Sequence, residues 1–208
     1  MKKHSLLLLV IACLLFSFSL SAQSPQPNWW VANGTVNTIV QSGNTVYLGG
    51  DFNMLGPNAP NGTAVDGATG VPNLSFAKPN NFVRTAVPDG SGGWYIGGDF
   101  TEVGGQARNR LARINSDGTL HAWNPNAGSS VSAMAIAGST VYVGGAFTSI
   151  GGQARFRLAA IDATTGTATA WNPNASGTVS AIAVSGSTVY AGGAFTTIGG
   201  QTRNRLAA

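Results

Sequence analysis

Short apolar runs along this chain alternate with small polar residues. The stretch "TVSAIAVSGSTVYAGGAF", residues 178–195, shows the pattern most clearly. In it, Ala181 and Ala183 fall on one face of an extended segment, because side chains alternate along a strand. Ile182 and Val184 fall on the opposite face. Since both faces are apolar, we expect this strand in a sheet that neighbouring sheets cover on two sides.

The apolar runs recur as an internal repeat. A Y-x-G-G phrase begins at four tyrosines with spacings of 48, 47 and 48 residues, namely Tyr47, Tyr95, Tyr142 and Tyr190. Four antiparallel strands fit each unit, and in the last units we expect them at residues 179–184, 188–195, 157–163 and 167–172. Four short strands in about 40–50 residues are typical of a β-propeller blade. A parallel β-solenoid is the alternative, but its coils are usually shorter and need fewer hairpins.

Two local motifs predict details of a unit. The paired glycines of each Y-x-G-G phrase fall inside the second strand, where glycine usually permits a bulge or the close approach of a neighbour. The segment "DATTG", which starts at Asp162, predicts the hairpin between the third and fourth strands, because Asp and Gly supply its turn geometry.

The repeats predict an all-β fold, a β-propeller with three full four-stranded blades and a partial fourth. The expected boundaries are a signal peptide (1–22), an N-terminal segment with a closing outer strand (23–35) and repeats at 36–82, 83–130, 131–178 and 179–208. One interpretation is that the four units close into a small ring, with an outer strand supplied by the N-terminal segment. We favour the other, a fragment of a larger propeller, because the last unit is incomplete.

The first residues have the order of a secretory signal peptide. Lys2 and Lys3 form a basic start, and an apolar run over 6–20 precedes small residues. The run is short for a membrane span. We therefore expect a secreted or cell-surface protein with no membrane span after cleavage. A lipoprotein anchored through Cys13 is less favoured, because apolar residues continue well past that cysteine.

Charge and cysteine content argue against a nucleic-acid partner and against disulfides. The chain has 11 Lys and Arg against 7 Asp and Glu, and two of the basic residues leave with the leader. No block of like charge remains, so we expect no nucleic-acid partner. The one cysteine also lies in the leader, so the mature chain has no disulfide and depends on packing for its stability.

No catalytic constellation stands out in the mature chain, and we expect it not to be an enzyme. His121 is its one histidine, with no nucleophile motif around it, and His/Cys metal sites are excluded by count. The segment from Ala160 to Trp171 is similar to the tryptophan-docking repeat of quinoprotein dehydrogenases, but one extra residue before Trp171 turns its ring to the other face. We therefore expect no cofactor.

Arginine pairs are the strongest candidate for a binding site. Each follows a "GGQ" segment between the second and third strands, and the pairs are Arg108 and Arg110, Arg155 and Arg157, and Arg203 and Arg205. Because the two arginines of a pair are two residues apart, both side chains would lie on the same face of an extended segment. Repetition would then place them in an arc on one rim, able to grip carboxylates or anionic glycans. The alternative is structural, with each arginine bonding backbone carbonyls to tie its blade to the next.

The repeated "GGxFTxIGGQxRNRLAxID" unit resembles the delta-sixty type of β-propeller repeat, which is loosely similar to kelch and Rax-type propellers. The resemblance covers about residues 28–208 and departs in the first unit, which lacks the arginines. It implies a propeller fold and a secreted bacterial surface protein without an assigned activity. Our hypothesis is a non-catalytic scaffold for a protein or glycan ligand. The alternative is the N-terminal propeller domain of a larger secreted enzyme, a hydrolase or quinoprotein-like dehydrogenase.

Overall fold

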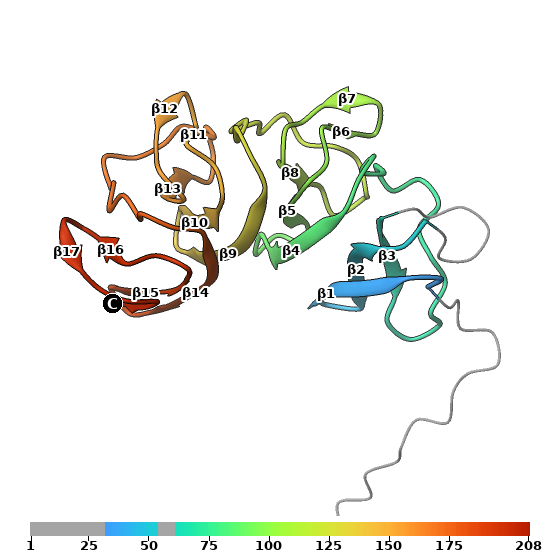
Figure 1. Cartoon of the computed structure of the whole chain (residues 1–208). Helices are drawn as coiled ribbons and strands as arrows, with labels where there is room; N and C mark the ends of the chain where they lie inside the picture. The colour runs from blue at the N-terminus through green and yellow to red at the C-terminus, as the bar shows by residue number, and fades with distance from the viewer. Residues whose placement is uncertain (1–31, 54–60) are drawn as a thin grey trace, which may run out of the picture.

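Four antiparallel sheets stand side by side in an open arc (Figure 1). The computed structural model describes residues 32–53 and 61–208. The expected leader at 1–22, with Cys13, lies outside these residues, as does most of the N-terminal segment at 23–35. No helix long and apolar enough to cross a bilayer occurs in the part of the chain that is described.

Each sheet has three strands, and the first of them lies on the inner side of the arc (Figure 1). We call the sheets blades 1 to 4. Blade 1 contains β1 (Thr35–Ser42), β2 (Thr45–Asp51) and β3 (Gly62–Asp66). Blade 2 contains β4 (Val83–Pro88), β5 (Trp94–Gly98) and β8 (Leu111–Ile114). Blade 3 contains β9 (Val131–Ala137), β10 (Thr140–Gly145) and β13 (Leu158–Asp162), and blade 4 contains β14 (Val179–Ser185), β15 (Thr188–Gly193) and β18 (Leu206–Ala207).

The predicted strands agree with this arrangement except at the fourth strand. In blade 3 the segment 167–172 pairs through one isolated bridge, between Ile161 and Ala168, and not as a regular strand. The segment then leaves the sheet and runs to Pro173, and proline cannot donate to a strand ladder. The fourth strand is thus reduced to a short outer contact.

Small hairpins that we did not predict fill the connection between the second and third strands. They are β6 (Glu102–Val103) with β7 (Gln106–Ala107), β11 (Ser149–Ile150) with β12 (Gln153–Ala154), and β16 (Thr197–Ile198) with β17 (Gln201–Thr202). Both glycines at each tip have positive φ, for example 58° at Gly104 and 75° at Gly105. Left-handed backbone at two successive turn residues favours glycine strongly, which explains the repeated Gly-Gly.

Aspartates shape the turns after the third strand, as predicted for Asp162. Its carboxylate accepts hydrogen bonds from the backbone amides of Thr164 and Thr165 at 2.9 and 2.6 Å. Asp66 does the same for Thr69 in blade 1, and Asp117 for Thr119 in blade 2. The hydroxyls of Thr69 and Thr119, followed by their backbone amides, lower the pKa of the Asp66 and Asp117 carboxyls. For Asp162 the backbone amide of Thr165 contributes most to the lowered pKa.

The paired glycines have the two predicted roles, one each. The first glycine of the pair in blade 3 is Gly144. A Cβ added there would lie 2.7 Å from Cγ1 of Val179, because this valine of the next blade packs directly onto the strand. A Cβ on the second, Gly145, would lie 2.1 Å from the carbonyl oxygen of Ser130, at a register shift in its own sheet. The glycines therefore allow close approach between blades and a bulge within each blade.

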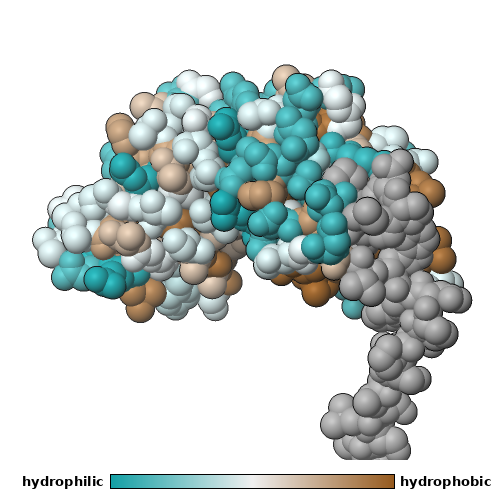
Figure 2. All heavy atoms as spheres, turned by 45° about the vertical axis from the view of Figure 1, so that its right-hand side comes forward, coloured by the Kyte–Doolittle hydropathy of each residue, from teal (hydrophilic) through white to brown (hydrophobic). Residues whose placement is uncertain are grey.

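The core lies between blades. One cluster joins Tyr95 and Trp123 of blade 2 to Val141 and Ile161 of blade 3, and similar clusters join blade 1 to blade 2 and blade 3 to blade 4. Most of the surface visible in Figure 2 is polar or weakly polar, with small separate apolar patches, several along its lower margin. Burial therefore depends on each blade having a neighbour on both sides.

Candidate functional site

The candidate arginines directly follow the three hairpins, which lie on the outer side of the arc (Figure 1). Their turns are exposed, including the side chains of Gln106, Gln153 and Gln201. Below each turn one apolar residue is buried, for example Ile150 at 1% exposure. Each hairpin is thus anchored by its blade and presents a polar tip to solvent.

The first arginine of each pair is engaged with its own blade. The guanidinium of Arg108 donates to the carbonyl of His121 at 3.1 Å, and that of Arg155 donates to the carbonyl of Thr169 at 2.6 Å. Both acceptors lie in the short outer segment of the same blade. These two arginines therefore hold the hairpin against the outer segment, and neither bond reaches the next blade.

The second arginine departs from the extended conformation that we expected. Its φ is 63° at Arg110, 64° at Arg157 and 68° at Arg205, in the left-handed region. The two side chains of a pair consequently do not leave one face of an extended segment. Arg157 donates to the carbonyl of Ala175, in the link that leads to blade 4, at 3.2 Å. The expectation that an arginine ties its blade to the next thus fits this position.

Blade 4 presents its arginine pair differently. Arg203 and Arg205 are exposed, whereas the four arginines of the two pairs in blades 2 and 3 are half-buried. Arg203 donates to the carbonyl of Thr202 at 3.1 Å. The six candidate residues therefore lie as pairs on separate blades, and the environments of the pairs differ.

Phe156 is the feature of the rim that sequence reasoning missed. It is 41% exposed and lies between Arg155 and Arg157, in a position that Asn109 and Asn204 occupy in the other two pairs. The substitution of one aromatic residue into an otherwise repeated "RNR" was the available signal. An exposed aromatic ring beside cationic side chains is a common element of binding surfaces.

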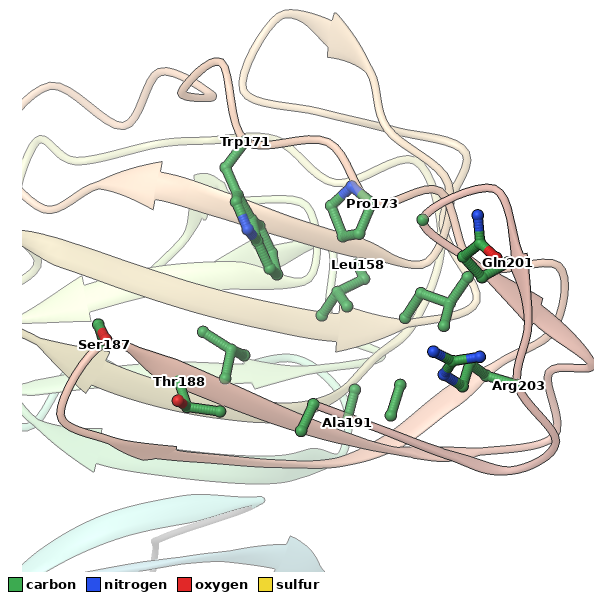
Figure 3. A pocket seen from close by; sticks show the side chains of 13 residues that line it. Leu158, Trp171, Pro173, Ser187, Thr188, Ala191, Gln201 and Arg203 are labelled. Atoms are coloured by element: carbon green, nitrogen blue, oxygen red, sulfur yellow. The ribbon is translucent and has the colours of Figure 1, made fainter.

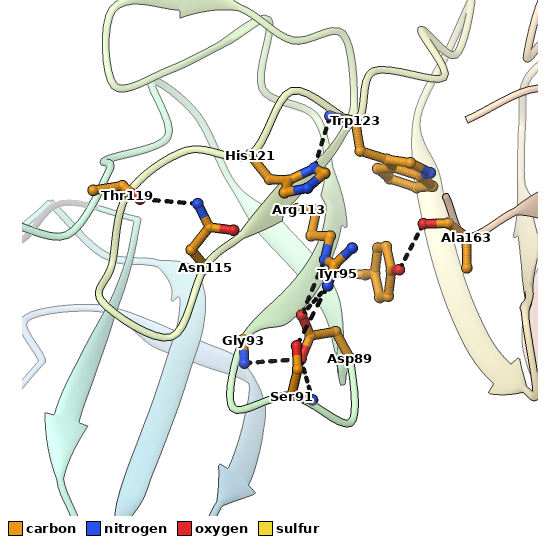
Figure 4. A network of polar contacts seen from close by, with 10 residues as sticks. All are labelled: Asp89, Ser91, Gly93, Tyr95, Arg113, Asn115, Thr119, His121, Trp123 and Ala163. Atoms are coloured by element: carbon orange, nitrogen blue, oxygen red, sulfur yellow. Dashed lines mark hydrogen bonds and ion pairs between the residues drawn. The ribbon is translucent and has the colours of Figure 1, made fainter. Parts of the chain in front are cut away.

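A polar network in blade 2 gathers most of the remaining chemistry (Figure 4). Arg113 donates to the Asp89 carboxylate at 2.7 Å and lies over the Tyr95 ring at 5.4 Å from its centroid. Burial would raise the pKa of the Asp89 carboxyl, but hydrogen bonds from Ser91 and Arg113 outweigh it and hold the pKa below its usual range. The side chains of Asp89 and Arg113 are 1% and 20% exposed, so this ion pair is partly buried.

His121 has a structural part in the same blade. Its Nδ1 accepts a hydrogen bond from the backbone amide of Trp123 at 3.0 Å. In blade 3, the hydroxyl of Thr169 accepts the equivalent bond from Trp171 at 3.3 Å. At equivalent positions, a histidine and a threonine thus both accept a hydrogen bond from the backbone amide two residues later. Burial, with a smaller contribution from the nearby Arg113 charge, lowers the pKa of His121.

A pocket of about 440 Å³ lies between blade 4 and the outer part of blade 3 (Figure 3). Its lining includes Leu158, Trp171, Thr188 and Arg203. Between blades 2 and 3 the corresponding place is filled, because the indole Nε1 of Trp123 donates to the carbonyl of Asp162 at 3.0 Å and Gly166 packs beside the ring. The pocket is therefore the place between two blades that side chains fill elsewhere in the arc, and it is not a separate ligand cavity.

Groups of three or more His, Cys, Asp or Glu side chains able to hold a metal ion are absent from residues 32–53 and 61–208. Several charged groups there have structural contacts, among them the turn aspartates and the ion pair of Arg84 with Asp99.

The fold and repeated sheets define an all-β protein built of β-propeller blades. Residues 88–120 and 140–163, in blades 2 and 3, match the model of a family described as a domain of unknown function, DUF5122, with a β-propeller. This supports the propeller part of the expected resemblance, whereas the delta-sixty type remains a prediction.

Solved structures give a likeness of fold. The computationally designed Ika4 protein is 15% identical with a TM-score of 0.55, covering 79% of this chain and 88% of its own. The designed Ika8 protein is 16% identical with a TM-score of 0.44, covering 81% of this chain and 60% of its own. No match was found among curated proteins.

Proposed function

We propose that this chain is a non-catalytic scaffold, secreted or displayed at a cell surface, whose hairpin rim contacts a protein or glycan ligand. The rim repeats one short hairpin on each of three blades, so its exposed tips lie in series along the outer side of the arc. Repeated loops on a rigid framework are a common basis for binding surfaces.

The use of the ionisable side chains favours binding over catalysis. A nucleophile or general base needs a partner within hydrogen-bond reach and a substrate site beside it. The Asp89 carboxylate pairs with Arg113. His121 accepts a hydrogen bond from a backbone amide, and at the equivalent position of blade 3 a threonine accepts the same bond. Neither group is arranged for proton transfer to a bound molecule.

Phe156 is the observation that carries the proposal. Exposing 41% of a phenylalanine has no packing benefit, and two of the three hairpins have asparagine there. Aromatic rings contribute large contact areas at a low cost in conformational entropy, which is why they dominate many interfaces. The flanking arginines supply donors for carboxylate or hydroxyl groups beside the ring.

Glycan-array and cell-surface binding measurements on the full chain test the proposal. Phe156→Asn is a conservative change, because it restores the residue of the other hairpins, and we expect it to weaken binding about tenfold, as for a central interface residue. Arg108→Ala, Arg155→Ala and Arg203→Ala test the arginines, with thermal stability measured in parallel.

A matched control separates ligand contact from folding. Gln106→Ala changes an exposed hairpin residue on a different blade, and we expect little effect on a ligand centred at Phe156. If binding persists unchanged in Phe156→Asn and in the three arginine variants, the rim is not the ligand surface and the proposal fails.

A further inference from the structure

The hairpin segments of blades 2 and 3 have the same arrangement of strands but different charges. In blade 2 the segment "GGDFTEVGGQARNR" carries two acids, Asp99 and Glu102, together with its arginine pair. The equivalent segment of blade 3, "GGAFTSIGGQARFR", has Ala146 and Ser149 in those two positions. The arginine pair of blade 3 therefore has no acidic neighbour within its own segment.

Asp99 shows what an acid does at the first of these positions. Its carboxylate accepts a hydrogen bond from Nε of Arg84 at 2.9 Å. This contact, with further contributions from the charges of Arg84 and Arg110, holds the pKa of the Asp99 carboxyl below its usual range. The carbonyl oxygen of Arg110 also accepts a hydrogen bond at 3.0 Å from the amide of Gly98, next to Asp99. The second arginine of blade 2 therefore lies within electrostatic range of an acid.

The same backbone arrangement in blade 3 brings no acid to the second arginine. The carbonyl oxygen of Arg157 accepts from the amide of Gly145, also at 3.0 Å, and the neighbouring Ala146 is exposed. The one acid among residues 131–178 is Asp162, five residues beyond Arg157 along β13. That separation is about 16 Å along a strand, beyond the screening length of about 8 Å in physiological salt. The arginine pair of blade 3 is therefore not neutralised within its blade.

Phe156 places an aromatic ring between these two charges. Among residues 131–178, all of which the structure describes, it is the one large hydrophobic side chain that is exposed. A protein interface usually has an apolar core built from several such side chains. The C–H face of one sugar ring, in contrast, covers a single aromatic ring, whose negative face attracts the weakly positive hydrogens. This surface therefore fits a sugar better than an apolar protein patch.

We propose that the ligand of blade 3 is an acidic polysaccharide with uronate carboxylates, which presupposes the binding function proposed above. A sugar ring stacks on Phe156, and a uronate carboxylate accepts hydrogen bonds from Arg157. A guanidinium has five N–H donors, and the bond from Arg157 to the carbonyl of Ala175 uses one of them. Ala146 and Ser149 determine specificity, because an acid at either position would repel the carboxylate.

Arg155 contributes charge to this site more than it contributes hydrogen bonds. Its guanidinium already donates to the carbonyls of Ala154 and Thr169, at 2.9 and 2.6 Å. The positive charge nevertheless stays beside Phe156, and it attracts an anionic chain at a distance where no direct bond is needed. The two arginines of the pair thus have different roles, with Arg157 as the direct contact.

Binding of the full chain to uronate polysaccharides tests the ligand class. The probes are polygalacturonate, alginate and hyaluronan, each beside its carboxyl-reduced form, which keeps the sugar ring and loses the charge. We expect at least one acidic polymer to bind about tenfold more tightly than its reduced form, as for one charge-assisted contact. Added salt should reduce this difference, because exposed charges are screened. Equal binding of the two forms, or binding of neither, overturns the proposal.

Two matched double variants test the specificity positions. Ala146→Asp with Ser149→Glu gives blade 3 the acids of blade 2 and should weaken binding of the acidic polymer at least about tenfold. Ala146→Asn with Ser149→Gln adds side chains of nearly the same size without charge, and should bind at least about tenfold more tightly than the acidic pair. Both positions are exposed, and thermal unfolding verifies that both variants fold. Equal affinities of the two variants would overturn the role of charge.

Polyglutamate and Phe156→Asn separate the ligand class from the rim itself. If the chain binds polyglutamate and none of the polysaccharides, the ligand is an acidic protein, so the polysaccharide is wrong while the rim stays a binding surface. Binding to cells that requires Phe156 but is indifferent to carboxylates also overturns the acidic ligand alone. If Phe156→Asn and the three arginine variants leave all binding unchanged, the proposed function fails as well.

Discussion

Blade 3 and blade 4 have nearly the same sequence through their first two strands and hairpin, yet equivalent side chains differ in exposure. Ala133 is buried and Ala181 is exposed, although each faces the side on which a following blade would lie. Local sequence therefore determines the form of a blade, whereas its neighbours determine how much of it is buried.

The comparison also assigns tasks to the repeated residues. Valine, glycine, tyrosine and tryptophan form the contact between blades, while the first arginine of a pair and the turn aspartate organise the structure within one blade. Because each repeat contributes both halves of an interface, stability should follow the nearest-neighbour behaviour of repeat proteins. Equivalent substitutions in interior and end blades can test this directly.

The largest expected difference in unfolding free energy is between substitutions of the two equivalent tryptophans. Trp123 is 2% exposed and bonded to Asp162, so Trp123→Ala should lower the free energy of unfolding by about 3–5 kcal/mol. Trp171 borders the open pocket beside blade 4, so Trp171→Ala should lower it by about 1–2 kcal/mol. Urea denaturation, at a concentration where the chain is monomeric, measures both. Equal losses would contradict the looser packing of Trp171 between blades 3 and 4.

The first glycines of the Gly-Gly pairs give the next largest difference in stability between an interior blade and blade 4. Gly144→Ala places a methyl group 2.7 Å from Val179, and the strain should lower the free energy of unfolding by about 1–3 kcal/mol. Gly192→Ala meets no atom nearer than 3.7 Å and should change it by less than about 0.5 kcal/mol. The same denaturation experiment applies. A larger loss in Gly192→Ala would show that blade 4 is covered in the monomer.

Substitutions of the first arginines in blades 3 and 4 should differ by a smaller amount of unfolding free energy. Arg155→Gln leaves the carbonyl of Thr169 without its 2.6 Å donor and should lower the free energy of unfolding by about 1 kcal/mol. Arg203 is exposed, so Arg203→Gln should change it by less than about 0.5 kcal/mol. Thermal unfolding followed by circular dichroism compares the pair. A reversed order would contradict the structural part given to Arg155.

The smallest effect concerns pH. Because the pKa of His121 in the folded chain lies below its ordinary value, the unfolded chain binds more protons between the two values. Its contribution to stability is therefore complete above the unfolded pKa, near 6.5, and is lost as pH falls toward the folded pKa. His121→Thr reproduces blade 3 and should reduce the difference in Tm between pH 7.5 and pH 5.5. An unchanged difference would exclude His121 as its source.

Much of the fold could be predicted from the sequence because the repeat is strong. Strand periodicity placed β14 and β15, the paired glycines indicated close approach, and Asp162 indicated its turn. The fourth strand was overpredicted, because an apolar alternation does not show that the segment leaves the sheet toward Pro173. The arginine geometry failed for a related reason, since spacing alone did not reveal the positive φ of the second arginine.

Differences in exposure between equivalent residues required the structure. Val36 and Val131 have equivalent sequence positions, and only their neighbours distinguish them. Phe156 was visible in the sequence as a departure from a repeated asparagine, but its importance depends on the exposure of its ring. The candidate arginines could be located from the repeat, whereas their hydrogen-bond partners lie 13 to 18 residues away along the chain.

The central claim is that consecutive repeats fold as separate blades whose faces pack in chain order. Oxidative cross-linking of Gly144→Cys with Val179→Cys tests it most directly, because the Cβ atoms would lie 3.2 Å apart, just below the usual range for a disulfide. We predict a disulfide within one chain, detected by mass spectrometry, and none in Gly97→Cys with Val179→Cys, which skips a blade. Free thiols in the first variant, or a disulfide in the second, would contradict the account.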